Sequence, residues 1–527
     1  MIDRSVLSTS NKKNDSLIGS AGLVSGATTF SRILGLIREQ VMAYFFGAGM
    51  ATDAFVAAFR IPNLLRDMFA EGALSAAFVP VFKEKAVKES TQEAFSLANV
   101  VISAVLIVVG LIVLLGIVAA PAIVYIMAHG FTDSPDKFDL TVGLSRVMMV
   151  YLLLVSLSAL VMGMLNSFGR FGIPALSPAM FNLGTVLTVF CLYHYFNQPA
   201  YTLAIGVIVG GVGQVAVQLP SLLRIGYRFH FRLSFLDEGL KRVVRLLTPM
   251  IVGLSAGRVN ILVSTLLASF LMEGAISYLN YAYRLMHFPL GVFAVALGTV
   301  ALPKASELVA RGEHDKLGRT FEEAIGANLF VVVPSAVFLA VMGRDVIELI
   351  YQWGAFSAVS SERTALALLH YSYGLIGFAA VRVTVPFFYA FKDSRKPMIA
   401  SIISVAINLI LYYPMIRLLD FAGLAAATSI AGLVNFILLL RWLPALGIDI
   451  SMARVGLKTF RMLVAAAAAF YISRLMPYQF AFDPATLPGR IVQLVVPLLF
   501  AALLYLLFCF ILRVREVGLL KRFFVRK

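Results

Sequence analysis

Long apolar runs separated by short polar connections account for almost the whole of this chain. A helix that crosses a bilayer needs ~20 mostly apolar residues, and about fourteen segments meet that requirement. Their approximate limits are 18–47, 52–82, 95–128, 140–168, 174–196, 200–225, 240–272, 275–308, 320–342, 362–391, 397–417, 421–445, 455–476 and 487–513. The pattern predicts an all-α polytopic membrane protein with about 14 transmembrane helices, whose connections are too short to fold as soluble domains.

Lysine and arginine are distributed unevenly between these connections. Thirty of them occur at the two termini and in one alternating set of connections. The opposite set contains six, which are Lys137, Arg344, Arg363, Arg417, Arg474 and Arg490. Because cytoplasmic loops of membrane proteins are enriched in Lys and Arg, this asymmetry predicts that both termini lie in the cytoplasm.

Composition agrees with a membrane protein and argues against several other classes. The 527-residue chain is 60% hydrophobic and 14% charged, which is too little charge to cover a soluble surface. The net charge of +16 lies in short clusters between apolar runs, so no nucleic-acid partner is expected. Cys191 and Cys509 each stand alone in an apolar run, and no disulfide or metal site is expected.

The sequence resembles itself at a shift of about 224 residues. ATDAFVAAFRI, from Ala51, aligns with AISYLNYAYRL, from Ala275, and FGRFGIP, from Phe168, aligns with FKDSRKP, from Phe391. This predicts two parallel six-helix repeats plus a C-terminal helix pair, although chance similarity between apolar segments stays an alternative. The expected parts are a cytoplasmic N-terminus (1–17), two lobes (18–226 and 240–446), an additional transmembrane hairpin (454–513) and a basic cytoplasmic tail (514–527).

About eight arginines lie inside the predicted spans, where charge is costly. They are Arg32, Arg38, Arg60, Arg66, Arg146, Arg258, Arg284 and Arg382. Facing lipid, they would together cost ~20 kcal/mol at ~2.5–3.5 kcal/mol each. The nearby acids (Glu39, Asp67 and Glu71) are too few to neutralise them. Most of these arginines fall in the first, second, seventh and eighth spans, so we expect a cationic central cavity that binds an anionic ligand.

Arginine suits a phosphate ligand because its planar guanidinium donates several hydrogen bonds and stays charged. Residues six apart on a helix differ by ~120°, so Arg32 and Arg38 share a face only if the helix bends, for example at Gly35. The alternative is that Arg38–Glu39 and Arg66–Asp67 are structural ion pairs. Arg146 and Arg382, away from the expected cavity, are interpreted as structural.

Several motifs closely resemble the MurJ/MviN family of bacterial lipid II flippases, within the multidrug, oligosaccharidyl-lipid and polysaccharide exporter superfamily. They are SRILGLIRE, FGAGMATDAF, RIPNLLRDMFAEGALSAAFVPVF and YRLMHFPLGVFAVALGTVALP. The resemblance implies a flippase, not an enzyme, in the bacterial inner membrane. It would move lipid II, a disaccharide-pentapeptide on undecaprenyl diphosphate, from the cytoplasmic to the periplasmic leaflet by alternating access. It would act as a monomer among membrane lipids, without a cofactor and with a coupling cation as one option.

The same resemblance assigns site residues. It implies substrate binding by Arg32, Arg38, Asp53, Arg66 and Arg284. From their positions near this group we also expect supporting or gating roles for Ser31, Glu39, Arg60, Arg258 and His287. His287 has two readings, a pH sensor or a packed side chain. Tyr283 and His287 stand where relatives carry acids, and Asp67 where they carry a base. A flippase for another undecaprenyl-diphosphate-linked glycan, a drug or ion antiporter, and a non-transporting scaffold are the alternatives.

Overall fold

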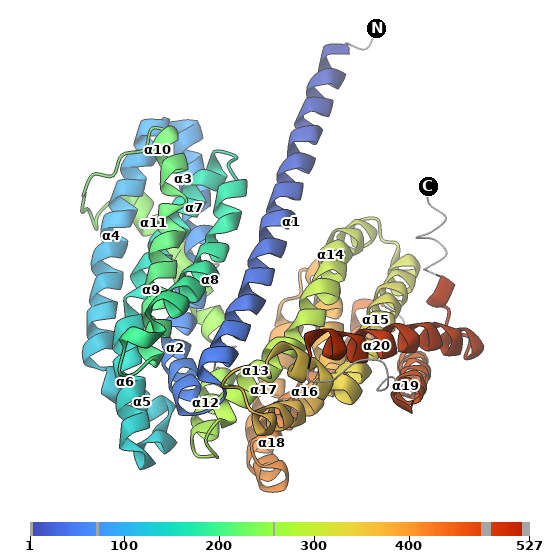
Figure 1. The fold of residues 1–527 in the computed structure, drawn as a ribbon. Coiled ribbons are helices and arrows are strands. Elements are labelled where there is room, and N and C mark those ends of the chain that lie inside the picture. Colours follow the sequence, from blue (N-terminus) through green and yellow to red (C-terminus); the bar gives the residue numbers. More distant parts are fainter. Residues whose placement is uncertain (1–3, 70–72, 257–258, 449, 476–485, 519–527) are drawn as a thin grey trace. The chain divides into compact units, whose positions relative to one another are not determined.

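The computed structural model describes residues 4–69, 73–256, 259–448, 450–475 and 486–518, and every regular element in these ranges is helical (Figure 1). Ten helical segments are long and apolar enough to cross a membrane. All ten coincide with predicted spans, which confirms the all-α polytopic fold class.

The four other predicted spans, 18–47, 52–82, 240–272 and 275–308, are helical where described but are not among these ten. They are the first, second, seventh and eighth spans, in which most of the arginines occur. The charged residues that they contain lower their hydropathy. In the eighth span a π-helical stretch, Leu290–Ala294, follows Pro289. The count of fourteen stays a prediction.

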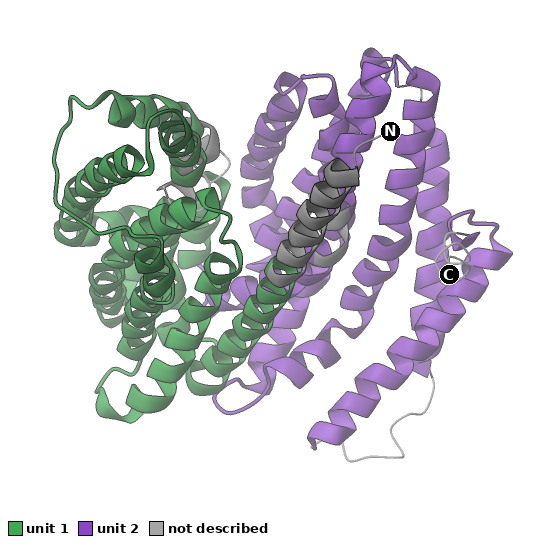
Figure 2. Ribbon diagram, turned by 90° about the horizontal axis from the view of Figure 1, so that it is seen from above, with its two compact units in different colours: residues 1–270 green, residues 271–527 purple. Residues whose placement is uncertain are grey.

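The chain forms two compact units, one ending at Phe270 and the other beginning at Leu271 (Figure 2). The helices of the first unit are α1 (Arg4–Phe46), α2 (Met50–Phe69), α3 (Ala73–Lys88), α4 (Thr91–Val118), α5 (Ala120–Met127), η1 (His129–Asp133), α6 (Pro135–Met149), α7 (Tyr151–Ser167), α8 (Gly172–Leu192), η2 (Tyr193–Tyr195), α9 (Ala200–Ala216), α10 (Leu219–Arg224), α11 (Glu238–Ala256) and α12 (Val259–Ser269).

The helices of the second unit are α13 (Ala275–Pro289), η3 (Leu290–Ala294), α14 (Val295–Ala310), α15 (His314–Ile350), α16 (Ala358–Ala390), α17 (Arg395–Leu419), α18 (Ala422–Trp442), η4 (Pro444–Leu446), α19 (Met452–Leu475) and α20 (Leu487–Ile511).

Helices α11 and α12, which form the predicted seventh span, pack within the first unit. Helix α11 lies against α3 and α4, and α12 lies against α5 and η1. An ion pair of 2.7 Å between Arg242 and Glu84 joins α11 to α3. The units are therefore divided after this span, whereas the lobe limits expected from the repeat (18–226 and 240–446) place it in the second half. Those lobe limits and the repeat stay predictions.

Glycines allow helices α8 and α9 to approach closely. A Cβ atom on Gly184 would lie 2.6 Å from the backbone of Gly210, and one on Gly206 would lie 2.8 Å from the Cα of Thr185. Small residues at helix contacts are the usual means of tight packing in membranes, where no hydrophobic force drives helices together. This contact orients α8, which carries residues of the candidate site.

We expect Gly184→Ala to lower the thermal stability of the protein, because the added methyl group meets backbone atoms that cannot move aside. Overpacking of this kind typically costs about 1–3 kcal/mol. Gly110→Ala on α4 is the matched control, since no atom lies within 4 Å of its Cβ position. Both variants are heated in detergent, and the loss of the monodisperse size-exclusion peak is measured as a function of temperature. Equal melting temperatures would contradict the packing role of Gly184.

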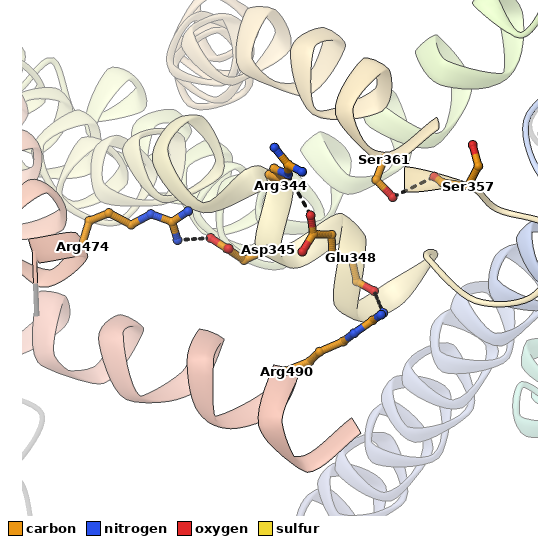
Figure 3. Close-up of polar contacts among 7 residues, drawn as sticks. All are labelled: Arg344, Asp345, Glu348, Ser357, Ser361, Arg474 and Arg490. Atoms are coloured by element: carbon orange, nitrogen blue, oxygen red, sulfur yellow. Dashed lines mark hydrogen bonds and ion pairs between the residues drawn. The ribbon is translucent and has the colours of Figure 1, made fainter. Parts of the chain in front are cut away.

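The hairpin of α19 and α20 is attached to α15 at both ends. At one end Arg474 pairs with Asp345, and Arg490 donates hydrogen bonds to the backbone oxygens of Glu348 (2.7 Å) and Gln352 (3.0 Å) (Figure 3). At the other end the Tyr505 hydroxyl donates to the Phe330 backbone oxygen at 2.9 Å. Polar contacts at two levels fix the hairpin's position on α15, as a scaffold role requires. Two roles for this hairpin, a scaffold and an apolar surface for a lipid tail, both stay predictions.

Candidate functional site

Helix α1 carries the first group of candidate residues, and α8 positions it. The Asn182 side chain on α8 donates a hydrogen bond of 3.1 Å to the backbone oxygen of Ser31. A Cβ atom on Gly35 would lie 3.6 Å from the same amide nitrogen, so Gly35 lets the two helices meet there. Helix α1 is continuous from Arg4 to Phe46, and Gly35 interrupts nothing in it. The glycine therefore contributes to packing, and the helix does not break there to bring Arg32 and Arg38 together.

Arg32 and Arg38 have different surroundings. The Arg38 guanidinium forms an ion pair with the carboxylate of Glu39, and its central carbon lies 5.3 Å from the ring centre of Phe181 on α8. Glu39 is 3% exposed. Arg32 is exposed and makes no hydrogen bond or ion pair within the described part of the chain. The ion-pair interpretation thus applies to Arg38, and Arg32 keeps its full positive charge available.

Helix α2 contributes Asp53, which the structure places in a buried ion pair. Its carboxylate accepts a hydrogen bond of 2.7 Å from the Lys137 ammonium on α6. Asp53 is 1% exposed, and Lys137 also lies 4.2 Å from the ring centre of Phe131. A buried carboxylate needs such a partner, because a lone charge at this depth is very costly. Asp53 therefore joins α2 to α6 while remaining locally neutral.

Arg60 and Arg66 occupy the second half of α2, where both side chains are half-buried and each has an interaction partner. The apolar side chains beside them, Ile61 and Leu65, pack against a core on α4 and α6. That packing fixes the orientation of this part of α2. Arg258 lies outside the described residues.

The second unit carries a separate group on α13 and α16. The His287 ring lies 4.0 Å from that of Tyr283, and its Nδ1 is 3.0 Å from the Tyr283 backbone oxygen. The guanidinium groups of Arg284 and Arg382 both act electrostatically on His287. Arg284 and Arg382 are exposed, and Arg284 has an interaction partner. The structure therefore brings two arginines and a histidine together in this unit.

Two residues that sequence reasoning did not place in the site belong to these groups. The sequence marks Lys137 only as one of the six basic residues in the connections that contain few of them. It lies 84 residues from Asp53 in the chain, and no sequence pattern indicates that the two pair. Arg382 was interpreted as structural and distant, yet it lies close enough to act on His287. The aligned spacing of the two halves could not reveal either contact, because neither residue belongs to a repeated motif. Arg146 is exposed on α6.

Ion pairs offset part of the positive charge of the candidate residues. Within the first unit, Arg38 and Lys137 are offset by Glu39 and Asp53, whereas Arg32 has no carboxylate partner in the described chain. Within the second unit, Arg284 lies on α13 and Arg382 on α16, two helices that pack against each other. Within the described chain, no group of three or more His, Cys, Asp or Glu side chains could hold a metal ion. Membrane proteins keep arginines in their helices where these side chains face water or a ligand. Their positive charge suits an anionic ligand.

The fold and these charged helices define a polytopic membrane transporter. Residues 42–493 match the family model "Lipid II flippase MurJ". A probable lipid II flippase MurJ of Bdellovibrio bacteriovorus is 32% identical over 96% of this chain and 97% of its own length. The lipid II flippase MurJ of Burkholderia cenocepacia is 33% identical over 81% of this chain and 83% of its own length. The chain therefore belongs to the MurJ family.

Solved structures agree with this assignment. A lipid II flippase MurJ in an inward closed conformation matches with a TM-score of 0.76 and 27% identity, over 93% of this chain and 98% of the other. An inward-facing multidrug resistance MATE family transporter of the MOP superfamily matches with a TM-score of 0.67 and 14% identity, over 81% of this chain and 98% of the other. The second match shows a shared fold alone. The first match agrees with the expected family, and the expected superfamily stays a prediction.

Proposed function

We propose that this protein is a flippase that moves lipid II from the cytoplasmic to the periplasmic leaflet of the bacterial inner membrane. The observation that carries the proposal is the match to MurJ relatives over nearly the full length of both chains, with a solved MurJ structure among them. The protein would work by alternating access as a secondary-type transporter, driven by the membrane potential or an ion gradient. It would act as a monomer with both termini in the cytoplasm.

In this proposal the arginines bind the diphosphate of the substrate. Arg32, Arg66 and Arg284 supply positive charge, and Arg38 adds a guanidinium whose orientation is held by Glu39 and Phe181. Asp53 maintains the position of α2 through Lys137 and so sets where Arg60 and Arg66 lie. Ser31, Arg258 and His287 have supporting roles. Arginine clamps suit a diphosphate, because each guanidinium can donate two hydrogen bonds to one phosphate group.

Lipid II translocation can be tested directly in cells. The protein is expressed in bacteria from which the native flippase is depleted, and lipid II in the outer leaflet is measured by its accessibility to an externally added enzyme that cleaves it. We expect accessible lipid II to return to the level seen before depletion. If the protein is present in the membrane and lipid II stays in the cytoplasmic leaflet, the proposal is wrong. Translocation of a different undecaprenyl-diphosphate-linked glycan in the same assay would favour the alternative substrate.

A further inference from the structure

The connection between α10 and α11 exposes large apolar side chains in an unusual concentration. Five of them lie within eight residues, Phe229, Phe231, Leu233, Phe235 and Leu236. Phe231 is 62% exposed and Leu236 is 80% exposed. The connection has no regular secondary structure from Tyr227 to Ser234, and it runs beside α4 (Figure 1). Contiguous apolar patches on a surface usually mark contact with a partner or a membrane.

Hydrogen bonds attach this segment to α4. The Asn99 side-chain oxygen accepts one from the Tyr227 hydroxyl (2.7 Å) and one from the backbone nitrogen of His230 (3.2 Å). The Ser103 hydroxyl oxygen accepts one from the backbone nitrogen of Arg232 (2.9 Å). Asn99 and Ser103 are four residues apart and thus face the same side of α4. The segment therefore extends along the helix, with the backbone donors of His230 and Arg232 bonded to it.

The contacts with α4 give the position of the segment along this predicted span. The Tyr227 ring packs on Phe95, where the predicted third span begins, and Arg232 reaches Ser103. Eight residues of α-helix separate these two levels, which corresponds to ~12 Å. A Cβ atom on Gly239 would lie 2.6 Å from the Leu97 side chain. The chain thus runs along α4 as far as Ser103 and has returned toward the start of α4 by Gly239. By the predicted limits of the third span, the segment therefore lies beside the first residues of that span.

The arginines of the segment have no acidic partner. Arg228 is exposed and makes no side-chain hydrogen bond or ion pair within the described part of the chain. The Arg232 guanidinium donates to the Ser96 hydroxyl at 2.6 Å, seven residues nearer the start of α4 than its backbone contact. Long basic side chains extend toward the headgroups in this way when their backbone lies deeper. Asp237, which follows the segment in the chain, accepts a hydrogen bond from the backbone nitrogen of Leu240 at the start of α11.

We propose that residues 227–236 form an interfacial element that inserts into the cytoplasmic leaflet and binds anionic phospholipid. Phe229, Phe231 and Phe235 contact the acyl chains, while Arg228 and Arg232 hydrogen-bond the headgroup phosphate. The apolar patch, its position beside the predicted third span and two arginines without an acidic partner in the described chain all fit this one occupant. A second protein would have to compete with lipid for a surface at this depth. The inference goes beyond the proposed transport activity and does not depend on it.

Insertion is tested with a tryptophan reporter, Phe231→Trp, in a background with Trp353→Phe and Trp442→Phe. The purified full chain is placed in vesicles of phosphatidylcholine and phosphatidylglycerol, one of which carries brominated acyl chains. Leu111→Trp, in the middle of α4, and Val87→Trp, at the end of α3, calibrate lipid and water exposure. We expect the reporter at 231 to be quenched by brominated lipid and protected from aqueous acrylamide. Behaviour like that of the Val87→Trp reporter would overturn the insertion.

Anionic selectivity is tested with the same reporter at equal mole fractions of the two lipids. We expect brominated phosphatidylglycerol to quench more strongly than brominated phosphatidylcholine. Arg228→Gln with Arg232→Gln should remove this preference, because each basic residue at the surface strengthens anionic-lipid binding about fivefold. Lys88→Gln, which removes an exposed basic residue on α3, is the control for loss of positive charge outside the segment and should leave the preference intact. Equal quenching by the two lipids in the parent protein would overturn the headgroup assignment.

Discussion

Replacing Arg32, Arg66 and Arg284 together by glutamine is expected to abolish lipid II translocation while leaving the protein folded in the membrane. A hydrogen bond to a charged group contributes about 1.5–3 kcal/mol, so each arginine that contacts the diphosphate accounts for at least a tenfold change in binding. Three such losses exceed what substrate concentration in the membrane can offset. Glutamine keeps much of the side-chain length, so the loss is of charge rather than of packing. The leaflet assay in depleted cells measures the effect.

Arg146→Gln is the matched control for this experiment. Arg146 is also an exposed arginine of a predicted span, and it has no hydrogen-bond partner within the described chain. The Arg146→Gln variant should translocate lipid II at the rate of the parent protein. A single Arg32→Lys change should give an intermediate rate, because lysine keeps the charge but not the two-pronged geometry. If Arg146→Gln fails as completely as the triple variant, the site assignment is wrong, since general loss of basic charge would then explain both.

The second large effect is expected at the buried ion pair of α2 and α6. Lys137→Met leaves the Asp53 carboxylate, which is 1% exposed, without its ammonium partner. Removing one member of a buried pair typically costs about 3–5 kcal/mol, because the other charge stays desolvated. We expect a large drop in melting temperature and in the amount of folded protein recovered from membranes. Thermal denaturation in detergent measures the change.

The double variant Asp53→Asn with Lys137→Met should recover most of this stability, since it removes both charges at once. Lys88→Met provides the exposed comparison: its ion pair with Glu84 on α3 is solvated, and such pairs contribute about 0–1 kcal/mol. If Lys137→Met melts no lower than Lys88→Met, Asp53 is not stabilised by Lys137. The translocation rate of the stable double variant then tests whether the Asp53 charge acts in transport as well as in folding.

Hydropathy located the helices of this chain well because it depends on local composition alone. The ten apolar helices coincide with predicted spans, and the MurJ family indicated by motifs such as SRILGLIRE is confirmed. The four spans in which most of the arginines occur are less apolar because of the charge that they contain. The same charge made them candidates for the binding site. The ion pair of Arg38 with Glu39 was foreseen as an alternative, since the two residues are adjacent in the chain.

By itself the sequence determined the fold class, the positions of the helices, the family and the set of costly arginines, because each of these follows from composition, periodicity or motif. Only the tertiary structure decided which charges are neutralised. Asp53 meets Lys137 from another helix, Arg382 approaches His287, and the segment after Tyr227 descends along α4. Helix packing decides which residues become such partners. They lie too far apart in the chain for any local sequence pattern to indicate the contact. The energy of a buried charge depends on that packing.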